Sequence, residues 1–139
     1  MTGRTAVAGT VGIVLVSHSG PVAESVAALA LGLAGGARAP VAAAGGTPDG
    51  DLGTSAELIA EAARSVDGGA GVALLVDLGS AVLTVKAMLA EGDELPEGAR
   101  LVDAPFLEGA VAAVVTASTG ADLAAVAAAA GEAYGYRKE

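Results

Sequence analysis

The sequence contains no cysteine and no tryptophan, and only 2% of its 139 residues are aromatic. The absence of cysteine excludes disulfides, thiolate catalysis and cysteine-ligated metals, and it suits the cytoplasm, where we expect the protein. The scarcity of aromatic residues argues against nucleic-acid binding by base stacking. A formal net charge of −9 would repel phosphate backbones and anionic lipids but favour a basic protein partner. We therefore expect no nucleic-acid partner.

The chain also lacks a hydrophobic run of the roughly 20 residues that a membrane-spanning helix needs, so we expect no membrane insertion. Although 53% of the residues are hydrophobic, charged residues or clusters of Gly and Pro divide the apolar segments. The first of these, residues 11–16, is short and β-branched, which is typical of a strand and not of a signal peptide. We expect residues 1–10 to form an N-terminal tail, residues 11–136 a single domain, and residues 137–139 a C-terminal tail.

Strand and helix patterns alternate along the chain. The segments typical of buried strands are residues 11–16, 40–45, 72–76 and 99–102. A helical pattern follows each strand, and one more helix ends the chain. This alternation requires right-handed crossovers. It predicts an α/β fold with a doubly wound, mainly parallel four-stranded sheet, a possible extra edge strand, and helices on both faces.

The spacing of the larger apolar residues predicts which face of each helix packs on the sheet. The expected inward residues are Val22, Val26, Leu29 and Leu33 in the first helix; Leu58, Ile59, Ala62 and Ala63 in the second; Val82, Val85 and Leu89 in the third; and Leu107, Val111, Val114 and Val115 in the fourth. We expect Gly20 to be the N-cap of the first helix, Pro21 to lie in its first turn, and Gly35 and Gly36 to end it.

The only histidine, His18, stands between the first expected strand and the first expected helix. Ligands of open α/β sheets bind beyond the carboxyl ends of the strands, and the N-terminus of a helix favours an anion. A neutral imidazole in this position suits a histidine that accepts a phosphoryl group covalently and passes it on. With one histidine and no cysteine, the chain has few ordinary zinc ligands, and we expect no metal site.

Asp77 follows the third expected strand, at the position that matches His18. Its carboxylate could hydrogen-bond one ring nitrogen, fix the tautomer and stabilise positive charge during the reaction. Gly79 and Ser80 would keep this loop close and polar. A simpler interpretation stays open for each group: His18 as a loop histidine, and Asp77, Ser19 and Ser80 as helix caps.

Four segments together resemble the DhaM family, the phosphotransferase subunits of bacterial dihydroxyacetone kinases. They are "VGIVLVSHSGPVAESV", "GTSAELI", "ALLVDLGSAVL" and "DAPFLEGAVAAVVTASTGADL". The phosphoacceptor domain of that family is similar to mannose-family enzyme IIA, an α/β fold. The resemblance implies that His18 is the phosphoacceptor and that Asp77 supports it. The remaining residues in segments that match the active-face loops are Ser19, Gly20, Thr54, Gly79 and Ser80.

The resemblance also implies a relay of partners. His18 would receive phosphate from phospho-HPr, itself charged from phosphoenolpyruvate through enzyme I. It would then rephosphorylate ADP held on the DhaL subunit, and the ATP formed there would phosphorylate dihydroxyacetone on DhaK, so the chain itself needs no cofactor. Longer family members carry HPr-like and enzyme I-like domains after this one, and we expect separate chains to supply them here. We also expect a homodimer, although no convincing strand for exchange follows the last helix.

Two other functions remain open. A IIA subunit of a mannose-family sugar permease would use the same histidine chemistry, but "DLGSA" and "APFLEGAV" favour the dihydroxyacetone kinase subunit. A flavodoxin-like binding or regulatory module, with a structural His18 and no covalent phosphate, is the alternative from a different class.

Overall fold

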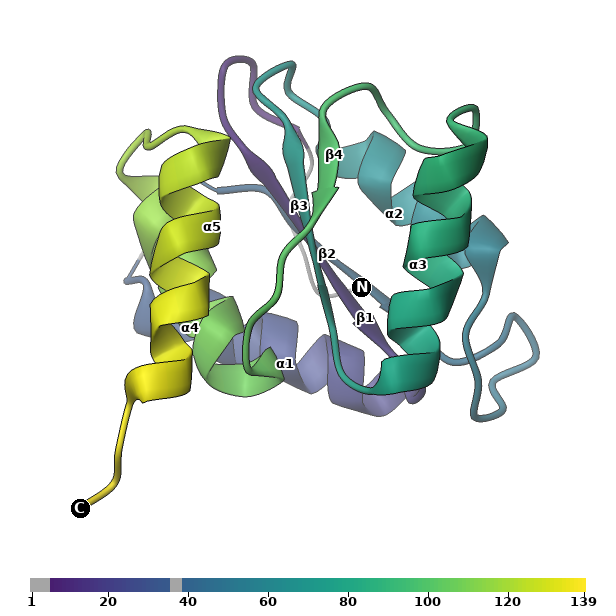
Figure 1. Ribbon diagram of the computed structural model, residues 1–139, viewed down its shortest axis with the longest axis horizontal. Helices are drawn as coiled ribbons and strands as arrows, with labels where there is room; N and C mark the ends of the chain where they lie inside the picture. The colour runs from purple at the N-terminus through teal and green to yellow at the C-terminus, as the bar shows by residue number, and fades with distance from the viewer. Residues whose placement is uncertain (1–5, 36–38) are drawn as a thin grey trace.

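The computed structural model describes residues 6–35 and 39–139 of the chain (Figure 1). Its single sheet has four parallel strands in the order β2-β1-β3-β4. The strands are β1 (Gly12–Ser17), β2 (Val41–Gly45), β3 (Val72–Val76) and β4 (Ala99–Leu101). The predicted α/β class and parallel sheet are confirmed, whereas the described ranges contain no strand for the possible extra edge.

The helices that join and follow the strands are α1 (Gly20–Leu33), α2 (Ala56–Val66), α3 (Gly79–Glu91), α4 (Phe106–Ser118) and α5 (Leu123–Glu132), with a 3₁₀ turn η1 (Ala133–Gly135). Helices α1, α4 and α5 cover one face of the sheet, and α2 and α3 cover the other (Figure 1). Within the parts of the chain that are described, no helix has both the length and the apolar character needed to cross a membrane.

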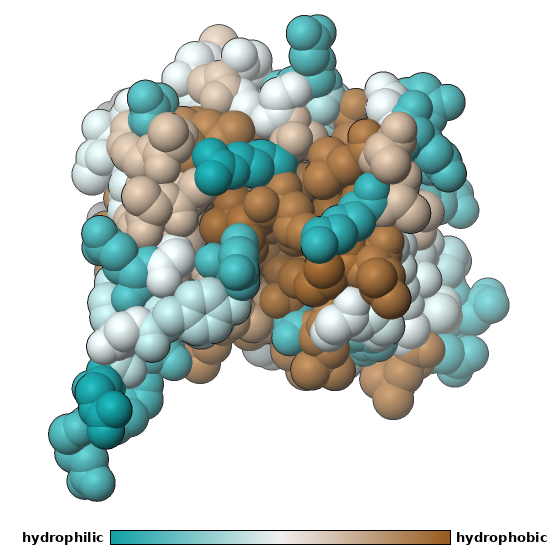
Figure 2. All heavy atoms as spheres, viewed as in Figure 1, coloured by the Kyte–Doolittle hydropathy of each residue, from teal (hydrophilic) through white to brown (hydrophobic). Residues whose placement is uncertain are grey.

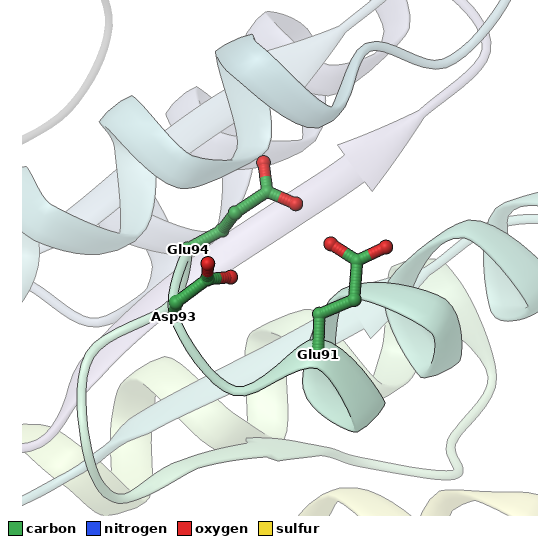
Figure 3. A group of neighbouring side chains, drawn as sticks. All are labelled: Glu91, Asp93 and Glu94. Carbon is green, nitrogen blue, oxygen red and sulfur yellow. The ribbon is translucent and has the colours of Figure 1, made fainter.

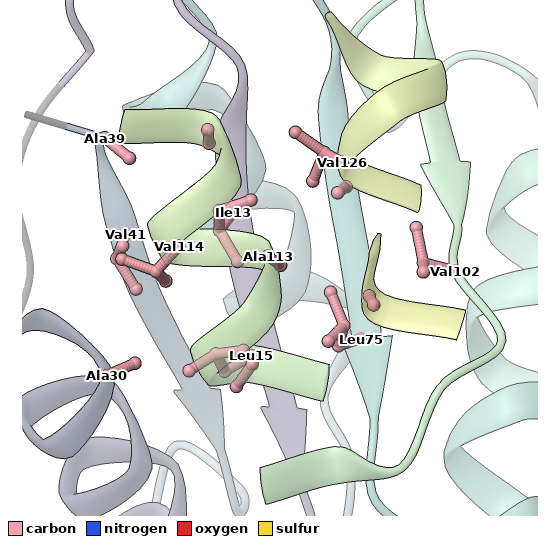
Figure 4. Packing of buried hydrophobic residues seen from close by; sticks show 14 of the residues in the cluster. Ile13, Leu15, Ala30, Ala39, Val41, Leu75, Val102, Ala113, Val114 and Val126 are labelled. Atoms are coloured by element: carbon pink, nitrogen blue, oxygen red, sulfur yellow. The ribbon is translucent and has the colours of Figure 1, made fainter. Parts of the chain in front are cut away.

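Alternate side chains of the central strands fill two cores. Ile13 and Leu15 point to the side of α1, α4 and α5 (Figure 4), while Val14 and Val16 point to the side of α2 and α3. Because successive side chains of a strand point to opposite faces, a strand covered on both faces must be apolar throughout. This requirement explains the continuous aliphatic run in β1.

Alanine makes most of the contact between α1 and the sheet, so the face predicted for this helix is wrong. Ala23, Val26, Ala27 and Ala30 are its buried residues. Of the expected residues, Val26 alone is buried, whereas Val22, Leu29 and Leu33 are exposed. The same helix therefore carries two apolar stripes, and the one with small side chains faces the sheet because it permits close approach of the two backbones.

The other helices follow the prediction to different degrees. In α2, Ile59, Ala62 and Ala63 are buried as expected, and Leu58 is partly exposed. In α3 only Val85 of the expected set is buried, and Val82 and Leu89 lie at the margin. In α4, Val114 is buried and Val111 is half-buried, but Leu107 and Val115 are exposed because Gly109, Ala110, Ala113 and Ala117 face the core.

Helix α1 begins at Gly20 and has Ser19 as its N-cap, which corrects the expectation that Gly20 is the cap. The hydroxyl of Ser19 accepts a hydrogen bond from the backbone N–H of Val22 at 3.3 Å, an interaction that glycine cannot make. Pro21 lies in the first turn as predicted. The helix ends at Leu33 and Gly35 follows with φ +60°; Gly36 lies outside the described residues.

The segment before β1 is attached to the end of α2 and is not a free tail. The backbone N–H of Ala6 donates to the carbonyl of Ser65, and that of Gly9 donates to the carbonyl of Gly68, both at 2.9 Å. Residues 1–5 of the expected tail lie outside the described residues. The segment therefore brings β1 into the sheet from a fixed direction.

Candidate active site

The site lies at the carboxyl edge of the sheet, where β1 and β3 end side by side. Val16 and Val76 are paired in register, so the residues that follow the two strands leave the sheet together. The backbone N–H of Asp77 donates to the carbonyl of Val16 at 3.1 Å. The imidazole of His18 lies against Asp77, with 2.9 Å between Nδ1 and Oδ1.

The carboxylate of Asp77 accepts hydrogen bonds from several fixed donors. Oδ2 accepts from the backbone N–H of His18 at 3.0 Å and from the hydroxyl of Ser17 at 2.9 Å, and Oδ1 accepts from the N–H of Leu78 at 2.8 Å. Partial burial raises the pKa of Asp77, but the hydrogen bonds from His18, Ser17 and Leu78 outweigh it and bring the pKa below its ordinary value. Asp77 is therefore an anion at neutral pH.

The ionised carboxylate fixes the orientation of the histidine ring and which of its nitrogens faces Asp77. An ionised carboxylate can only accept hydrogen bonds, so Nδ1 of His18 carries a hydrogen and donates a hydrogen bond to Oδ1 of Asp77. Nε2 lies at close range to the hydroxyl of Ser80, which can donate to the lone pair that Nε2 holds whenever it carries no proton. The His18 side chain is 24% exposed, which leaves its ring within reach of solvent. The arrangement holds Nδ1 against Asp77 and leaves Nε2 facing Ser80.

Ser80 is the second residue of α3, so Nε2 of His18 lies beside the N-terminus of that helix. The first backbone N–H groups of a helix have no partner within the helix and carry part of its positive dipole. An anionic group on Nε2 would lie close to the Ser80 hydroxyl, at the positive end of α3. The local charge thus favours a phosphoryl group at this position.

Two residues that sequence reasoning missed, Ser17 and Thr84, form hydrogen bonds with the residues that contact the His18 ring. Ser17 is fully buried; its hydroxyl donates to Asp77 and accepts from the backbone N–H of Ser19 at 3.1 Å. Thr84 donates to the carbonyl of Ser80 at 3.2 Å. For Ser17 the available signal was a polar residue that directly follows a wholly aliphatic run, and for Thr84 it was the four-residue spacing from Ser80.

Two further predicted site residues, Thr54 and Ser19, make side-chain hydrogen bonds outside the His18–Asp77 pair. Thr54 reaches α3 through Oγ1, which is 3.1 Å from Oγ1 of Thr84. Ser19 caps α1, whereas the N-cap of α3 is Leu78, so the cap interpretation is wrong for Asp77 and for Ser80.

The predicted glycines differ in how tightly they are packed. Gly20 packs on Gly45, where a Cβ would lie 2.4 Å from the carbonyl oxygen of Ser19. At Gly79, by contrast, a Cβ would meet no atom within 4 Å. A close approach of backbones therefore exists at Gly45 but not at Gly79.

A hollow of about 390 Å³ adjoins the site on the side of β4. Figure 2 shows its apolar surface between α5 and α3. Asp77 and Leu78 line it, as do Asp103 and Tyr134, whose hydroxyl donates to Asp103 at 2.6 Å. The hollow thus extends from Asp77, the partner of His18, to the end of β4.

Three carboxylates cluster at the other end of α3. Glu91, Asp93 and Glu94 have ligand atoms within 4.8 Å of one another (Figure 3). The hydrogen bond with Glu91 raises the pKa of Glu94, as expected for crowded acids. Because α3 spans 13 residues, its two ends are about 20 Å apart. The cluster is therefore separate from the His18 site.

Fold and site together define an α/β domain with an anchored histidine at the carboxyl edge of a parallel sheet. The comparison with known families agrees with this class. Residues 12–127 match the EIIA-man family, described as the PTS system fructose IIA component. The chain belongs to this family.

Curated relatives are phosphoryl donor subunits named DhaM of PEP-dependent dihydroxyacetone kinases. The protein of Pantoea ananatis is 37% identical over 116 residues, which cover 81% of this chain and 24% of the relative. The corresponding figures for the protein of Escherichia coli are 36%, 81% and 25%. The chain thus spans about a quarter of these two relatives. A third such subunit, from Listeria innocua, is 36% identical over 106 residues, with 76% of this chain and 84% of the relative covered.

Solved structures share the fold. A crystal structure described as a protein of unknown function superposes with a TM-score of 0.76 at 29% identity, covering 88% of this chain and 94% of the other. A sigma-54 interaction domain protein from Enterococcus faecalis gives a TM-score of 0.58 at 22% identity, covering 84% of each chain, and shows the fold alone.

Proposed function

We propose that this chain is the phosphoryl donor subunit of a phosphoenolpyruvate-dependent dihydroxyacetone kinase and that His18 carries the phosphoryl group on Nε2. The observation that carries the proposal is the pair of contacts on the imidazole: Asp77 holds Nδ1, and Nε2 faces the Ser80 hydroxyl at the start of α3. The Listeria innocua relative, of which the chain covers 84%, supports the assignment to this kinase.

The first step is a transfer between two nitrogen atoms. The lone pair on Nε2 of His18 attacks phosphorus of phospho-HPr, a new N–P bond forms, and the N–P bond of the donor breaks and returns its electron pair to the donor imidazole. The ring of His18 gains positive charge, which the Asp77 carboxylate compensates at 2.9 Å. The Ser80 hydroxyl turns its hydrogen from Nε2 to a phosphoryl oxygen.

The second step reverses these roles. The terminal oxygen of ADP, held on DhaL, attacks phosphorus on His18, the N–P bond breaks, and the electron pair returns to Nε2. ATP formed on DhaL then serves dihydroxyacetone on DhaK. In this scheme the nucleotide stays on the partner, and this chain contributes the histidine, its orienting carboxylate and the N-terminus of α3. We place the relay in the cytoplasm. We also propose that the chain forms a homodimer, and light scattering would test this oligomeric state.

A IIA subunit of a sugar permease is the second candidate, and the description of the matching family as a fructose IIA component favours it. The two functions differ only in the acceptor of the phosphoryl group. The phosphorylated chain, isolated after reaction with phosphoenolpyruvate, enzyme I and HPr, should lose its phosphoryl group to DhaL loaded with ADP, with one ATP formed per group lost. Retention of the group with DhaL, and its loss to a sugar permease component, would contradict the kinase assignment.

A further inference from the structure

Ser17, the last residue of β1, is the single buried polar side chain among the residues that the structure describes, with an exposure of 0%. Burying a hydroxyl group is unfavourable unless hydrogen bonds replace those that it makes to water. An alanine would fit the same position without that penalty. The contacts of the hydroxyl, and not core packing, therefore distinguish serine from alanine at this position.

The partners of Ser17 fix the direction of both its hydrogen bonds. An ionised carboxylate can only accept a hydrogen bond, and a backbone N–H can only donate one. The Ser17 hydroxyl therefore donates its one hydrogen to Oδ2 of Asp77 at 2.9 Å and accepts from the N–H of Ser19 at 3.1 Å. Because the Ser19 N–H polarises the hydroxyl oxygen, it strengthens the hydrogen bond that Ser17 donates to Asp77.

The Asp77 carboxylate accepts four hydrogen bonds from described residues, two on each oxygen. Oδ2 accepts from the Ser17 hydroxyl and the His18 N–H, and Oδ1 accepts from the Leu78 N–H and Nδ1 of His18. These donors occupy the roughly four acceptor positions of a carboxylate. Three of them belong to the backbone or to the reacting ring. The Ser17 hydroxyl is therefore the one donor that a side-chain substitution can remove without changing either.

We propose that Ser17 tunes how readily phosphorylated His18 gives up its phosphoryl group, by drawing negative charge away from the oxygen of Asp77 that holds Nδ1; this rests on the function proposed above. Ser17 does not touch the reacting atoms and acts through Asp77. A donor on Oδ2 stabilises negative charge on that oxygen and leaves Oδ1 a weaker acceptor for the Nδ1 hydrogen. The positive charge of the phosphorylated ring is then stabilised less, and the phosphoryl group stays transferable.

The exchange with HPr shows where this tuning acts. An N–P bond forms at Nε2 of His18 while the N–P bond of phospho-HPr breaks and its electron pair returns to the donor nitrogen. The Nδ1 hydrogen stays between the ring and Asp77. Burial raises the pKa of Asp77, and the hydrogen bonds from His18, Ser17 and Leu78 lower it. Loss of the Ser17 donor should make the carboxylate a stronger base and shift the exchange toward phosphorylated His18.

The test measures the exchange equilibrium between HPr and this chain, approached from either phosphorylated partner and read by intact-protein mass spectrometry. Removing one of several charge-assisted hydrogen bonds in Ser17→Ala should shift the equilibrium constant about threefold or more toward phosphorylated His18. Ser17→Cys keeps the shape with a weaker donor and should give an intermediate constant. Ser118→Ala is the matched control, because it removes a half-buried hydroxyl that donates to the carbonyl of Val114 in α4, and it should leave the constant unchanged.

The NMR resonance of the Nδ1 hydrogen of His18 gives a readout that a loss of packing alone would not move. A stronger hydrogen bond to Asp77 should shift it downfield in Ser17→Ala, and Ser17→Cys serves both measurements if the alanine variant does not fold. An unchanged equilibrium constant, or a shift toward phospho-HPr, would overturn the proposal. Failure of wild type to accept the phosphoryl group from HPr would instead refute the proposed function, and the resonance would still test the effect of Ser17 on Asp77.

Discussion

Replacing Asp77 by asparagine tests the role of its negative charge with little change of shape. Two rigid donors face the carboxylate from different sides: the backbone N–H of His18 on Oδ2 and that of Leu78 on Oδ1. The NH₂ group of an asparagine would face one of these N–H groups in either orientation. The variant therefore loses the charge and at least one hydrogen bond.

The magnitude of the effect follows from the positive charge that develops on the imidazole. Removing one preorganised electrostatic contact to a developing charge typically costs about 3–4 kcal/mol, or about 100- to 1,000-fold in rate. We expect Asp77→Asn to lower the single-turnover rate of phosphoryl transfer from phospho-HPr by about this factor. An N–H group left facing another donor should also lower the free energy of unfolding by about 1–3 kcal/mol.

Rapid-quench measurement of His18 phosphorylation at saturating phospho-HPr gives this rate directly. Asp49→Asn is the matched control, since this exposed carboxyl lies in the neighbouring loop and should leave the single-turnover rate unchanged. A rate for Asp77→Asn within twofold of wild type would refute the reasoning, because the carboxylate would then orient the ring without stabilising charge.

Three further predictions concern stability and are measured by urea unfolding. Ser17→Ala removes a buried hydroxyl that donates to Asp77 and should cost about 1–3 kcal/mol; an unchanged midpoint would contradict the support that we assign to Ser17. Because the pKa of Asp77 lies below its ordinary value of 3.8, its ionised form adds stability above that value, and this stability is lost as the pH falls through the lowered pKa. The stability advantage of wild type over Asp77→Asn should thus be constant above about pH 5 and shrink in stronger acid; a constant difference throughout would be inconsistent with the lowered pKa. Gly45→Ala, whose Cβ would lie 2.4 Å from the Ser19 carbonyl oxygen, should cost about 1–3 kcal/mol, whereas Gly32→Ala, in open space, should cost nothing.

The strands could be predicted closely from sequence, but the helix faces could not. A strand that is buried on both faces needs a continuous aliphatic run. A short run of this kind, bounded by Gly or Pro residues, is typical of a strand and not of a helix. Helix α1 offers two apolar stripes, and hydrophobicity alone favours the one with Leu29 and Leu33. The sheet instead receives Ala27 and Ala30, because close packing depends on side-chain size as well as apolar character.

The sheet topology made one part of the candidate site predictable, the meeting of His18 and Asp77. His18 and Asp77 each follow a strand, and parallel neighbouring strands bring such residues together at one edge. The polar residue after the aliphatic run draws attention to Ser17, but its hydrogen bond to the Asp77 carboxylate depends on the local direction of the chain after the strand. The contact between Thr54 and Thr84 depends on how a ten-residue loop, 46–55, folds against α3.

The central claim is that Nε2 of His18 carries the phosphoryl group. Its most direct test is intact-protein mass spectrometry of wild type and His18→Ala after incubation with phosphoenolpyruvate, enzyme I and HPr, followed by ³¹P NMR of the product. We expect an acid-labile gain of one phosphoryl group in wild type, with the chemical shift of Nε2-phosphohistidine, and no gain in a folded His18→Ala protein. No gain in wild type, or an equal gain in the variant, would contradict it.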